Sequence, residues 1–341
     1  MAIPYEMLHC AASAMPPQVT IIVVTYNSRS CFARLEAALA AQTAPFHLIV
    51  HDNASAPDQR PTLADFPNAK IRQCVRNLGF AGGNNDAAAE VVTPFIALLN
   101  PDAYPDSDWV RRLLAAAERY PRAGAFGSTQ IMTNDGSIYD GLGDCYFAAG
   151  ASWRGGHGMT HAGTLSDASV FSACAAAALY RTEAWRAVGG FDARYFTYNE
   201  DIDLCFRLRL RGWQIAQVAN AVVHHEGSGG SQASTAFVTY HVMRNRIWTF
   251  VKNTPSWLFW VLLPAHAALT VYQCFGAAMN GQGRAAAAGV SAALSRLNEV
   301  WRDRTYIQTT STVGVCEIAS AMTWSPLKMA RRAPDLRSPP R

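Results

Sequence analysis

Strand-length apolar runs alternate with helical patterns along the first half of this 341-residue chain, and this alternation constrains the fold more than any other feature. The run VTIIVVTYNS (19–28) is continuous and rich in β-branched residues, as expected for a strand buried on both faces of a parallel sheet. SCFARLEAALAAQ (30–42) then has a helical pattern, with Ser30 as the predicted N-cap. The alternation predicts an α/β fold, a sheet with helices on both faces. Further strands are predicted at 46–55, 69–76 and 94–103, with a helix in NNDAAAEVV (84–92).

The rest of the chain is less regular. The segment 133–168 is rich in Gly and His and lacks periodicity, which predicts a long loop near a site, with disorder as the alternative. The remaining predicted elements are helices at 107–120, 182–190 and 235–253 and strands at 123–132, 172–181 and 213–225.

Polar residues follow the predicted strands at the points where the strands end. In α/β sheets ligands bind at the carboxyl ends of the strands. Thr25 and Asn27 in VTYNS are candidate partners for a nucleoside, and Asp52 in HDNAS is a candidate acceptor for the imide N–H of a pyrimidine base. The alternative is ordinary turn chemistry, since these residue types also form turns.

The stretch RNLGFAGGNN (76–85) is a second candidate ligand loop. Its glycines, Gly79 and Gly82 among them, allow close backbone approach, and Arg76 offers a fixed charge for a phosphate. Asn84 and Asn85 are expected to cap the following helix. The alternative is a Gly-rich connector that precedes a capped helix.

Candidate metal ligands end two predicted strands. Asp102 in LLNPD is a natural ligand for Mg²⁺ or Mn²⁺ on a diphosphate, and His224 in VVHHEG is a candidate second ligand. A carboxylate with an imidazole favours Mn²⁺ over Mg²⁺. We expect His225, on the opposite face of the strand, to have a different role. The alternatives are an Asn-Pro-Asp turn without metal and a structural histidine.

NEDIDLCFRLRLRGW (199–213) places three acids at a predicted helix start. Asn199 is the predicted N-cap, and Glu200, Asp201 and Asp203 complement the helix dipole in the first turn. Asp203 and Arg207 form an i,i+4 pair. The charge pattern alone is therefore explained without chemistry, and a proton acceptor or a metal ligand is the alternative.

A long segment without charged residues lies near the C-terminal end. No Asp, Glu, Lys or Arg occurs from 253 to 283, and WLFWVLLPAHAALTVYQCFGAAM (257–279) is long enough to span a bilayer. Pro264, His266 and Gln273 weaken a span, whereas the tryptophans at one end suit an interface. We predict a membrane-associated helix, with buried packing or a true span as alternatives.

Composition excludes some classes of protein. Half of the residues are hydrophobic, 16% are charged and the net charge is +4, which does not favour nucleic-acid binding. The eight cysteines lack a CxxC pair, which indicates reduced thiols of a cytoplasmic protein, and the N-terminus does not read as a secretory signal. The basic, proline-containing end is predicted to be disordered and solvated, with contact to an anionic membrane as the alternative.

In chain order the motifs VTYNS, HDNAS, RNLGFAGGNN, LLNPDA, GGFDARYFTYNEDIDLCFRLRLRGW, VVHHEGS and YHVMRN resemble the inverting glycosyltransferases of family 2, closest to the bacterial rhamnosyltransferases. The resemblance runs from Val19 to Asn245. It implies a GT-A fold, a Rossmann-like mixed sheet flanked by helices, with a nucleotide-sugar half, an acceptor half and a divalent metal, Mn²⁺ or Mg²⁺. The domains expected are an extension at 1–17, the catalytic domain at 18–234, a helical region at 235–305 and a basic tail at 306–341.

The resemblance also assigns residues. Asp201 matches the catalytic base, with Glu200 as the alternative, and Asp102 and His224 match the metal ligands. One departure is Asn100-Pro101-Asp102, where many relatives have a carboxylate at the first position, and this weakens the expected affinity for metal. His241, Arg244 and Asn245 match a motif near the diphosphate or acceptor. The expected nucleotide-sugar contacts are Thr25, Tyr26, Asn27, Asp52, Asn53, Arg76, Asn77, Gly79, Phe80, Gly82, Asn84, Asn100 and Asp102.

The expected reaction is transfer of L-rhamnose from dTDP-L-rhamnose to a saccharide or lipid-linked acceptor in bacterial cell-surface polysaccharide synthesis. It is expected at the inner face of the cytoplasmic membrane. A UDP-sugar donor, such as one carrying galactofuranose, is the alternative. Two other classes of protein are alternatives to a glycosyltransferase. A nucleotidyltransferase has little use for the Glu200-Asp201 pair. A non-catalytic nucleotide-sugar-binding protein would bind the donor without turnover.

Overall fold

A large mixed sheet forms the centre of the molecule, with strand order β10-β12-β6-β11-β4-β1-β2-β3. The computed structural model describes residues 16–161, 164–227 and 233–340. The first four strands are parallel, and β1 and β4 among them are continuous, buried apolar runs. They are β1 (Val19–Thr25), β2 (His47–Asp52), β3 (Ala69–Gln73) and β4 (Phe95–Leu99).

The other half of the sheet is mixed. β12 (Gln214–His225) pairs in parallel with β6 (Ala123–Met132), and β11 (Ala177–Arg181) is antiparallel to both β6 and β4. The short strands β5 (Ala103–Pro105), β7 (Tyr139–Gly141) and β10 (Ala168–Ser169) pair at its margins. This curled mixed sheet with flanking helices confirms the predicted GT-A class.

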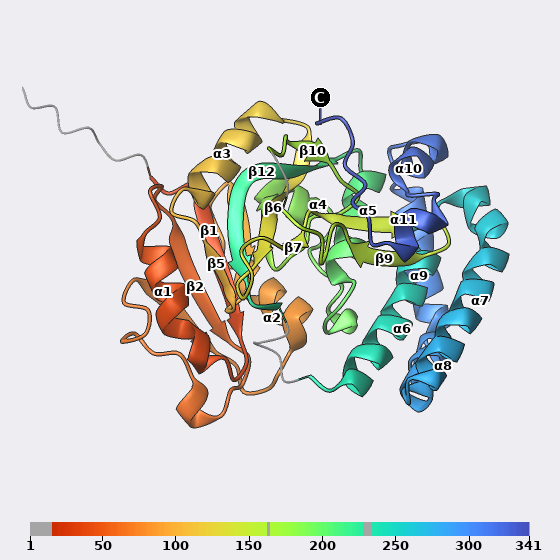
Figure 1. The fold of residues 1–341 in the computed structure, drawn as a ribbon, viewed down its shortest axis with the longest axis horizontal. Coiled ribbons are helices and arrows are strands. Elements are labelled where there is room, and N and C mark those ends of the chain that lie inside the picture. The colour runs from red at the N-terminus through yellow and green to blue at the C-terminus, as the bar shows by residue number, and fades with distance from the viewer. Residues whose placement is uncertain (1–15, 162–163, 228–232, 341) are drawn as a thin grey trace, which may run out of the picture.

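Helices cover both faces of the sheet, as predicted (Figure 1). α1 (Phe32–Ala40) and α3 (Trp109–Arg119) pack on the face that receives Ile21 and Val23 of β1. The opposite face receives Ile22, because successive strand residues point to opposite sides. It is covered by α2 (Gly79–Ala88), α4 (Thr182–Ala187) and α5 (Glu200–Leu210).

A third hydrophobic core joins the C-terminal helices to the sheet domain. Ile202 and Phe206 of α5 pack with Trp248 and Phe250 of α6 (Thr235–Asn253). The later helices gather beside α6, on the right in Figure 1. They are α7 (Ser256–Met279), α8 (Gly283–Ser295), α9 (Leu297–Thr309), α10 (Val315–Ala321) and α11 (Pro326–Ala330).

Two segments differ from the predictions. Part of the predicted loop 133–168 forms the hairpin β8 (Asp144–Phe147) and β9 (Ala151–Arg154). The predicted disordered tail is folded: Phe147 pairs with Thr323, Ser169 pairs with Arg337, and the Trp153 indole donates to the Ala333 carbonyl at 3.0 Å. Residues 322–337, which we call the C-terminal arm, therefore support the hairpin. Most of the predicted extension 1–17 lies outside the described residues.

Three helix N-caps predicted from the sequence are different in the structure. Helix α2 begins at Gly79, so Asn84 and Asn85 lie inside it rather than at its start. Asn84 donates to the Phe80 carbonyl at 2.9 Å. Ser30 lies in a 3-10 turn before α1. Asn199 occupies the N-cap position of α5, but its side chain accepts from the Ser152 hydroxyl at 2.7 Å instead of capping the helix.

Candidate active site

A pocket of about 320 Å³ lies at the N-terminus of α5, between that helix and the β8–β9 hairpin. It brings together four of the residues predicted from the sequence: Phe80, Asn100, Glu200 and Asp201. It also contains residues that sequence reasoning missed, because they belong to the hairpin and to the turn before β11. These are Asp144, Ser152, Trp153, Arg154, Cys174, Ala175 and Ala176.

The loop that enters α5 has an unusual backbone. Phe196, Tyr198 and Asn199 have φ angles of 65°, 67° and 63°, in the left-handed region that non-glycine residues rarely adopt. Such residues each cost on the order of 1–3 kcal/mol, so surrounding contacts must hold them. The loop therefore places the acids of α5 only as long as those contacts persist.

Asn245 of α6 supplies most of these contacts. Its Nδ2 donates to the carbonyls of Tyr195, Thr197 and Tyr198 at 3.0, 2.8 and 2.7 Å, and the residue is fully buried. The Arg244 guanidinium donates to the Tyr195 carbonyl at 2.8 Å. These hydrogen bonds hold the backbone that precedes Glu200 and Asp201.

His241 belongs to the same group of α6 residues. Its Nδ1 lies 3.0 Å from the Arg244 guanidinium, and its ring stacks on Phe196. Burial and the nearby Arg244 lower the pKa of His241 to about 4, so the ring is neutral at physiological pH. His241, Arg244 and Asn245 are not among the residues that line this pocket and lie beside the loop before α5. Their contact with a diphosphate or an acceptor stays a prediction.

Asp201 faces the pocket with its carboxylate fixed by the backbone. Its Oδ1 accepts from the Ile202 N–H at 2.8 Å and its Oδ2 from the Ala175 N–H at 3.2 Å. Burial raises the pKa of Asp201 above its ordinary value, while these two N–H groups and Arg154 oppose the rise. The result is a carboxylate of increased basicity in a defined orientation.

Glu200 and Asp144 are buried neighbours of Asp201. Burial, and then the charge of Asp201, raises the pKa of each well above its ordinary value. The Oε2 atom of Glu200 has no hydrogen-bond partner in the described part of the chain. Both side chains therefore favour the protonated form, which leaves Asp201 as the carboxyl group best suited to stay ionised.

Asp203 has a different, structural role. Its Oδ2 accepts from Arg207 at 2.9 Å, which confirms the predicted i,i+4 pair. Its Oδ1 accepts from Asn253 at 2.8 Å and lies 3.0 Å from the Lys252 ammonium. This buried network ties α5 to α6.

The metal ligands predicted at Asp102 and His224 do not lie together. His224 is half-exposed and its Nε2 lies 3.2 Å from Asp106 Oδ1. His225 instead faces Asp102, with 3.4 Å between its Nε2 and Oδ1. The structure thus turns His225, and not the predicted His224, toward Asp102, because adjacent strand residues point to opposite faces. Metal binding by either histidine stays a prediction.

The environment of His225 fits a metal ligand. Its Nδ1 bonds to Asp140 Oδ2 at 2.7 Å, and Asp140 in turn pairs with Arg154. Its buried Nε2 has no hydrogen bond among the described residues and is directed toward Asp102. A carboxylate on the far nitrogen of the imidazole is the usual support of a metal-bound histidine. Asp102 and His225 together are the donor set expected for Mn²⁺ or a related ion.

The predicted nucleoside residues meet where β1 and β2 end. Thr25 is the register partner of the buried Asp52, and its hydroxyl donates to Asp52 Oδ1 at 3.3 Å. Asn27, with a φ of 52°, accepts from the Ala56 N–H at 2.9 Å, and the adjacent Tyr26 is exposed. Contact of these residues with a base stays a prediction.

The Gly-rich stretch connects this end of the sheet to the loop before α5. Asn53 accepts from the Leu78 N–H and donates to the Gly79 carbonyl, each at 2.9 Å, and Asn77 accepts from the Gly79 N–H at 2.8 Å. Gly79 has a φ of 73°, and a Cβ atom there would lie 2.4 Å from the Phe196 carbonyl. Asn53, Asn77 and Gly79 thus shape the turn itself. Gly82 continues α2, and Arg76 is exposed at the start of the stretch.

The sequence of this chain is similar to those of known proteins. A family model described as "Glycosyltransferase like family 2" matches residues 16–255. The N-acetylglucosaminyl-diphospho-decaprenol L-rhamnosyltransferase of Mycobacterium tuberculosis (strain ATCC 25618 / H37Rv) is 29% identical over 278 residues, which cover 73% of this chain and 90% of that protein. The O-antigen biosynthesis protein RfbC of Myxococcus xanthus is 28% identical over 62% of this chain and 18% of that protein.

Solved structures share the fold at low sequence identity. TarS 1-349 of S. aureus, in complex with UDP-GlcNAc, superposes with a TM-score of 0.55 and 16% identity and covers 90% of this chain and 93% of that one. The mannosyltransferase PcManGT of Pyrobaculum calidifontis, in complex with GDP-Man and Mn²⁺, has a TM-score of 0.52 and 16% identity and covers 89% and 86%.

Proposed function

The chain belongs to the glycosyltransferase-like family 2 and is a glycosyltransferase, and from that premise we propose that it transfers L-rhamnose from dTDP-L-rhamnose to a lipid-linked saccharide with inversion. The activity for which the mycobacterial relative is named supports both the sugar and the kind of acceptor. A donor that carries UDP, as in the TarS complex, is the second candidate.

The observation that carries the proposed mechanism is the orientation of Asp201 in the pocket. An acceptor hydroxyl in the pocket gives its proton to the Asp201 carboxylate as its oxygen attacks the anomeric carbon. The bond from that carbon to the diphosphate oxygen breaks in the same displacement, so one base is enough and no covalent sugar–enzyme intermediate forms. Glu200, buried and of high pKa, stays protonated beside it.

The leaving diphosphate carries negative charge that a cation can stabilise. We infer that Asp102 and His225 hold a divalent cation, which when bound supplies electrostatic stabilisation of the diphosphate. Asn100 lines the pocket and lies two residues before Asp102 in sequence, and the neutral amide leaves this site with one carboxylate fewer. Asp140 keeps the His225 imidazole oriented toward Asp102.

We also infer that α7 lies on the membrane that carries the lipid-linked acceptor, at the cytoplasmic face. α7 is the one helix of the described residues that is long and apolar enough to cross a bilayer, and only 22% of its most apolar window is buried. Trp257, Trp260, Tyr272, Phe275 and Met279 are exposed along it. Such a face favours the membrane interface over water.

Replacement of the base tests the mechanism. Asp201→Asn is expected to lower kcat by about 10²–10⁴-fold and to leave donor-nucleotide binding intact. Asp135→Asn, at an exposed aspartate outside the pocket, serves as the matched control and is expected to retain wild-type turnover. Wild-type turnover in Asp201→Asn would remove Asp201 from the mechanism. A panel of dTDP-, UDP- and GDP-sugars tests the donor separately, and turnover with UDP-sugars alone would reject rhamnose.

A further inference from the structure

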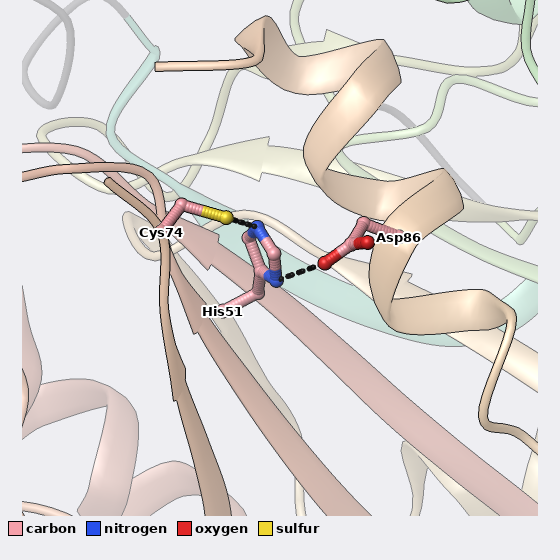
Figure 2. A group of neighbouring side chains, drawn as sticks. All are labelled: His51, Cys74 and Asp86. Atoms are coloured by element: carbon pink, nitrogen blue, oxygen red, sulfur yellow. Dashed lines mark hydrogen bonds and ion pairs between the residues drawn. The ribbon is translucent and has the colours of Figure 1, made fainter. Parts of the chain in front are cut away.

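His51, Cys74 and Asp86 form a cluster outside the pocket and apart from Asp102 and His225. His51 lies in β2, Cys74 directly follows β3, and Asp86 lies in α2. Figure 2 shows the Cys74 sulfur and the Asp86 carboxylate approaching different nitrogens of the His51 ring. Cys74 Sγ lies 3.2 Å from Nε2, and Asp86 Oδ2 lies 3.6 Å from Nδ1. One donor atom from each residue lies within 4.8 Å of the others.

The His51 ring is left incompletely satisfied by the protein. Its side chain is fully buried, yet Nδ1 has no hydrogen bond within the described residues and is directed at Asp86. Buried polar atoms without partners are uncommon and costly in native proteins. A ligand that draws the ring and the carboxylate together would remove this cost.

The protonation states exclude a thiolate–imidazolium nucleophile and suit a metal. Burial lowers the pKa of His51, so the imidazole is neutral and offers a lone pair. Burial, followed by the charge of Asp86, raises the pKa of Cys74, so the thiol keeps its proton until a cation displaces it. A bound cation deprotonates a coordinating thiol.

We propose that Cys74 and His51 bind a borderline-soft divalent cation, with Zn²⁺ as the representative. Thiolate and imidazole select Zn²⁺, whereas carboxylate and water suit Mg²⁺ and Mn²⁺. On binding, the cation joins Sγ and Nε2 and the thiol proton passes to solvent. The Nδ1–H of His51 then donates a hydrogen bond to Asp86, which fixes the tautomer of the ring, as in a carboxylate–histidine–zinc arrangement. Arg72 pairs with Asp86 at 2.6 Å and keeps this carboxylate in place.

The position of the cluster gives the bound cation a structural effect. The Cys74 N–H donates to the Asp52 carbonyl at 2.9 Å, and His51 directly precedes Asp52. The cation would therefore link β2 to the turn after β3, behind the predicted base-binding residue. Because only the folded chain brings the donors together, Zn²⁺ is expected to raise the thermal unfolding temperature. The proposed cation site does not depend on any step of the proposed sugar transfer.

Cobalt substitution tests the site in the full chain. Co²⁺ added to chelator-treated protein is expected to give a sulfur-to-metal charge-transfer band, which the oxygen and nitrogen donors of Asp102 and His225 do not produce. The band is expected to persist in Cys316→Ser, which removes an exposed thiol outside the cluster, and to disappear in Cys74→Ser. A band that survives in Cys74→Ser, or its absence from the wild type, would overturn the proposal.

Two further measurements keep the test independent of folding. Zn²⁺ is expected to protect Cys74, but not Cys316, from alkylation in the wild-type protein, as mapped by mass spectrometry. Equal alkylation of Cys74 with and without Zn²⁺ would refute the site even if Cys74→Ser did not fold. Asp86→Asn is expected to weaken Zn²⁺ binding by about 10- to 100-fold, and unchanged affinity would remove Asp86 from the site.

Discussion

Asn245 is predicted to be a positioning residue whose loss reduces both stability and turnover, although it does not line the pocket. Its Nδ2 carries two hydrogens and serves three carbonyls, so Asn245→Ala removes the equivalent of two backbone-directed hydrogen bonds. At about 0.5–1.5 kcal/mol each, these amount to about 1–3 kcal/mol. Asn245 Oδ1 also accepts from the charged Arg244 Nε at 2.8 Å, and loss of this hydrogen bond, worth about 1.5–3 kcal/mol, brings the total to about 2.5–6 kcal/mol.

The catalytic effect follows from the backbone that Asn245 holds. Without its hydrogen bonds, the residues with positive φ before α5 are expected to relax, and Asp201 at the end of that loop moves with them. A shift of about 1 Å at a catalytic group costs on the order of 10²-fold in rate. We therefore expect kcat to fall by about 10- to 100-fold. The dissociation constant of the donor nucleotide is expected to change little, since the side chain of Asn245 bonds to the loop before α5 and to Arg244 and not to Thr25, Asn27 or Asp52.

The assay combines urea unfolding with steady-state kinetics well below the unfolding transition. Asn280→Ala is the matched control, because Asn280 is exposed at the end of α7 and donates only to the Gly276 carbonyl. It is expected to change the free energy of unfolding by less than about 0.5 kcal/mol. Folded Asn245→Ala with wild-type kcat would refute the argument that this loop positions the base.

Three further outcomes are expected. Burial holds the pKa of Glu200 above that of the unfolded chain, so its contribution to stability is lost as pH rises through the folded-state pKa. Glu200→Gln should therefore unfold at higher urea concentration than the wild type at pH 8 but not at pH 4, and an equal midpoint at pH 8 contradicts this. His225→Ala should abolish stimulation by Mn²⁺ while His224→Ala retains it, and the reverse result would restore the ligand predicted from sequence. Phe275→Glu should reduce binding to anionic lipid vesicles by severalfold without loss of nucleotide binding, and undiminished binding would exclude this face of α7.

The sequence predicted the elements whose stability is local or whose pattern is strong. The continuous apolar run of β1 and the helix 235–253 appear with nearly the predicted bounds. The acids of α5 were placed at the start of a helix, as found. Their approach to one pocket could be expected because ligands gather at strand ends and helix starts.

The parts that sequence reasoning missed depend on contacts between distant residues. The β8–β9 hairpin has short strands that are supported by the C-terminal arm, through Phe147 with Thr323 and Trp153 with Ala333. No local sequence pattern predicts these contacts between the hairpin and the C-terminal arm. The alternation in DCYF and ASWR around Gly150, whose φ is 87°, is a signal from which the hairpin could have been predicted.

The sequence motif pointed to His224, whereas His225 faces Asp102 in the structure, and this difference has a specific physical cause. β12 shifts register against β6 between Val218 and Val222. An irregularity of this kind breaks the strict alternation of faces along a strand, so the face of a later residue cannot be counted from its start. The motif placed two histidines at the end of the strand, and the three-dimensional structure shows that His225 is the one that faces Asp102.

The contacts of the C-terminal arm impose an order of assembly during translation. The parallel strands that include Asp52 are complete early in synthesis, when the nascent chain has emerged past β4. The hairpin side of the pocket is supported by the contacts of Trp153 with Ala333 and of Ser169 with Arg337, and these partners emerge after all of α7. A nascent chain therefore exposes the apolar helix α7 before the pocket is complete, so the membrane contact inferred for α7 can form before the first turnover.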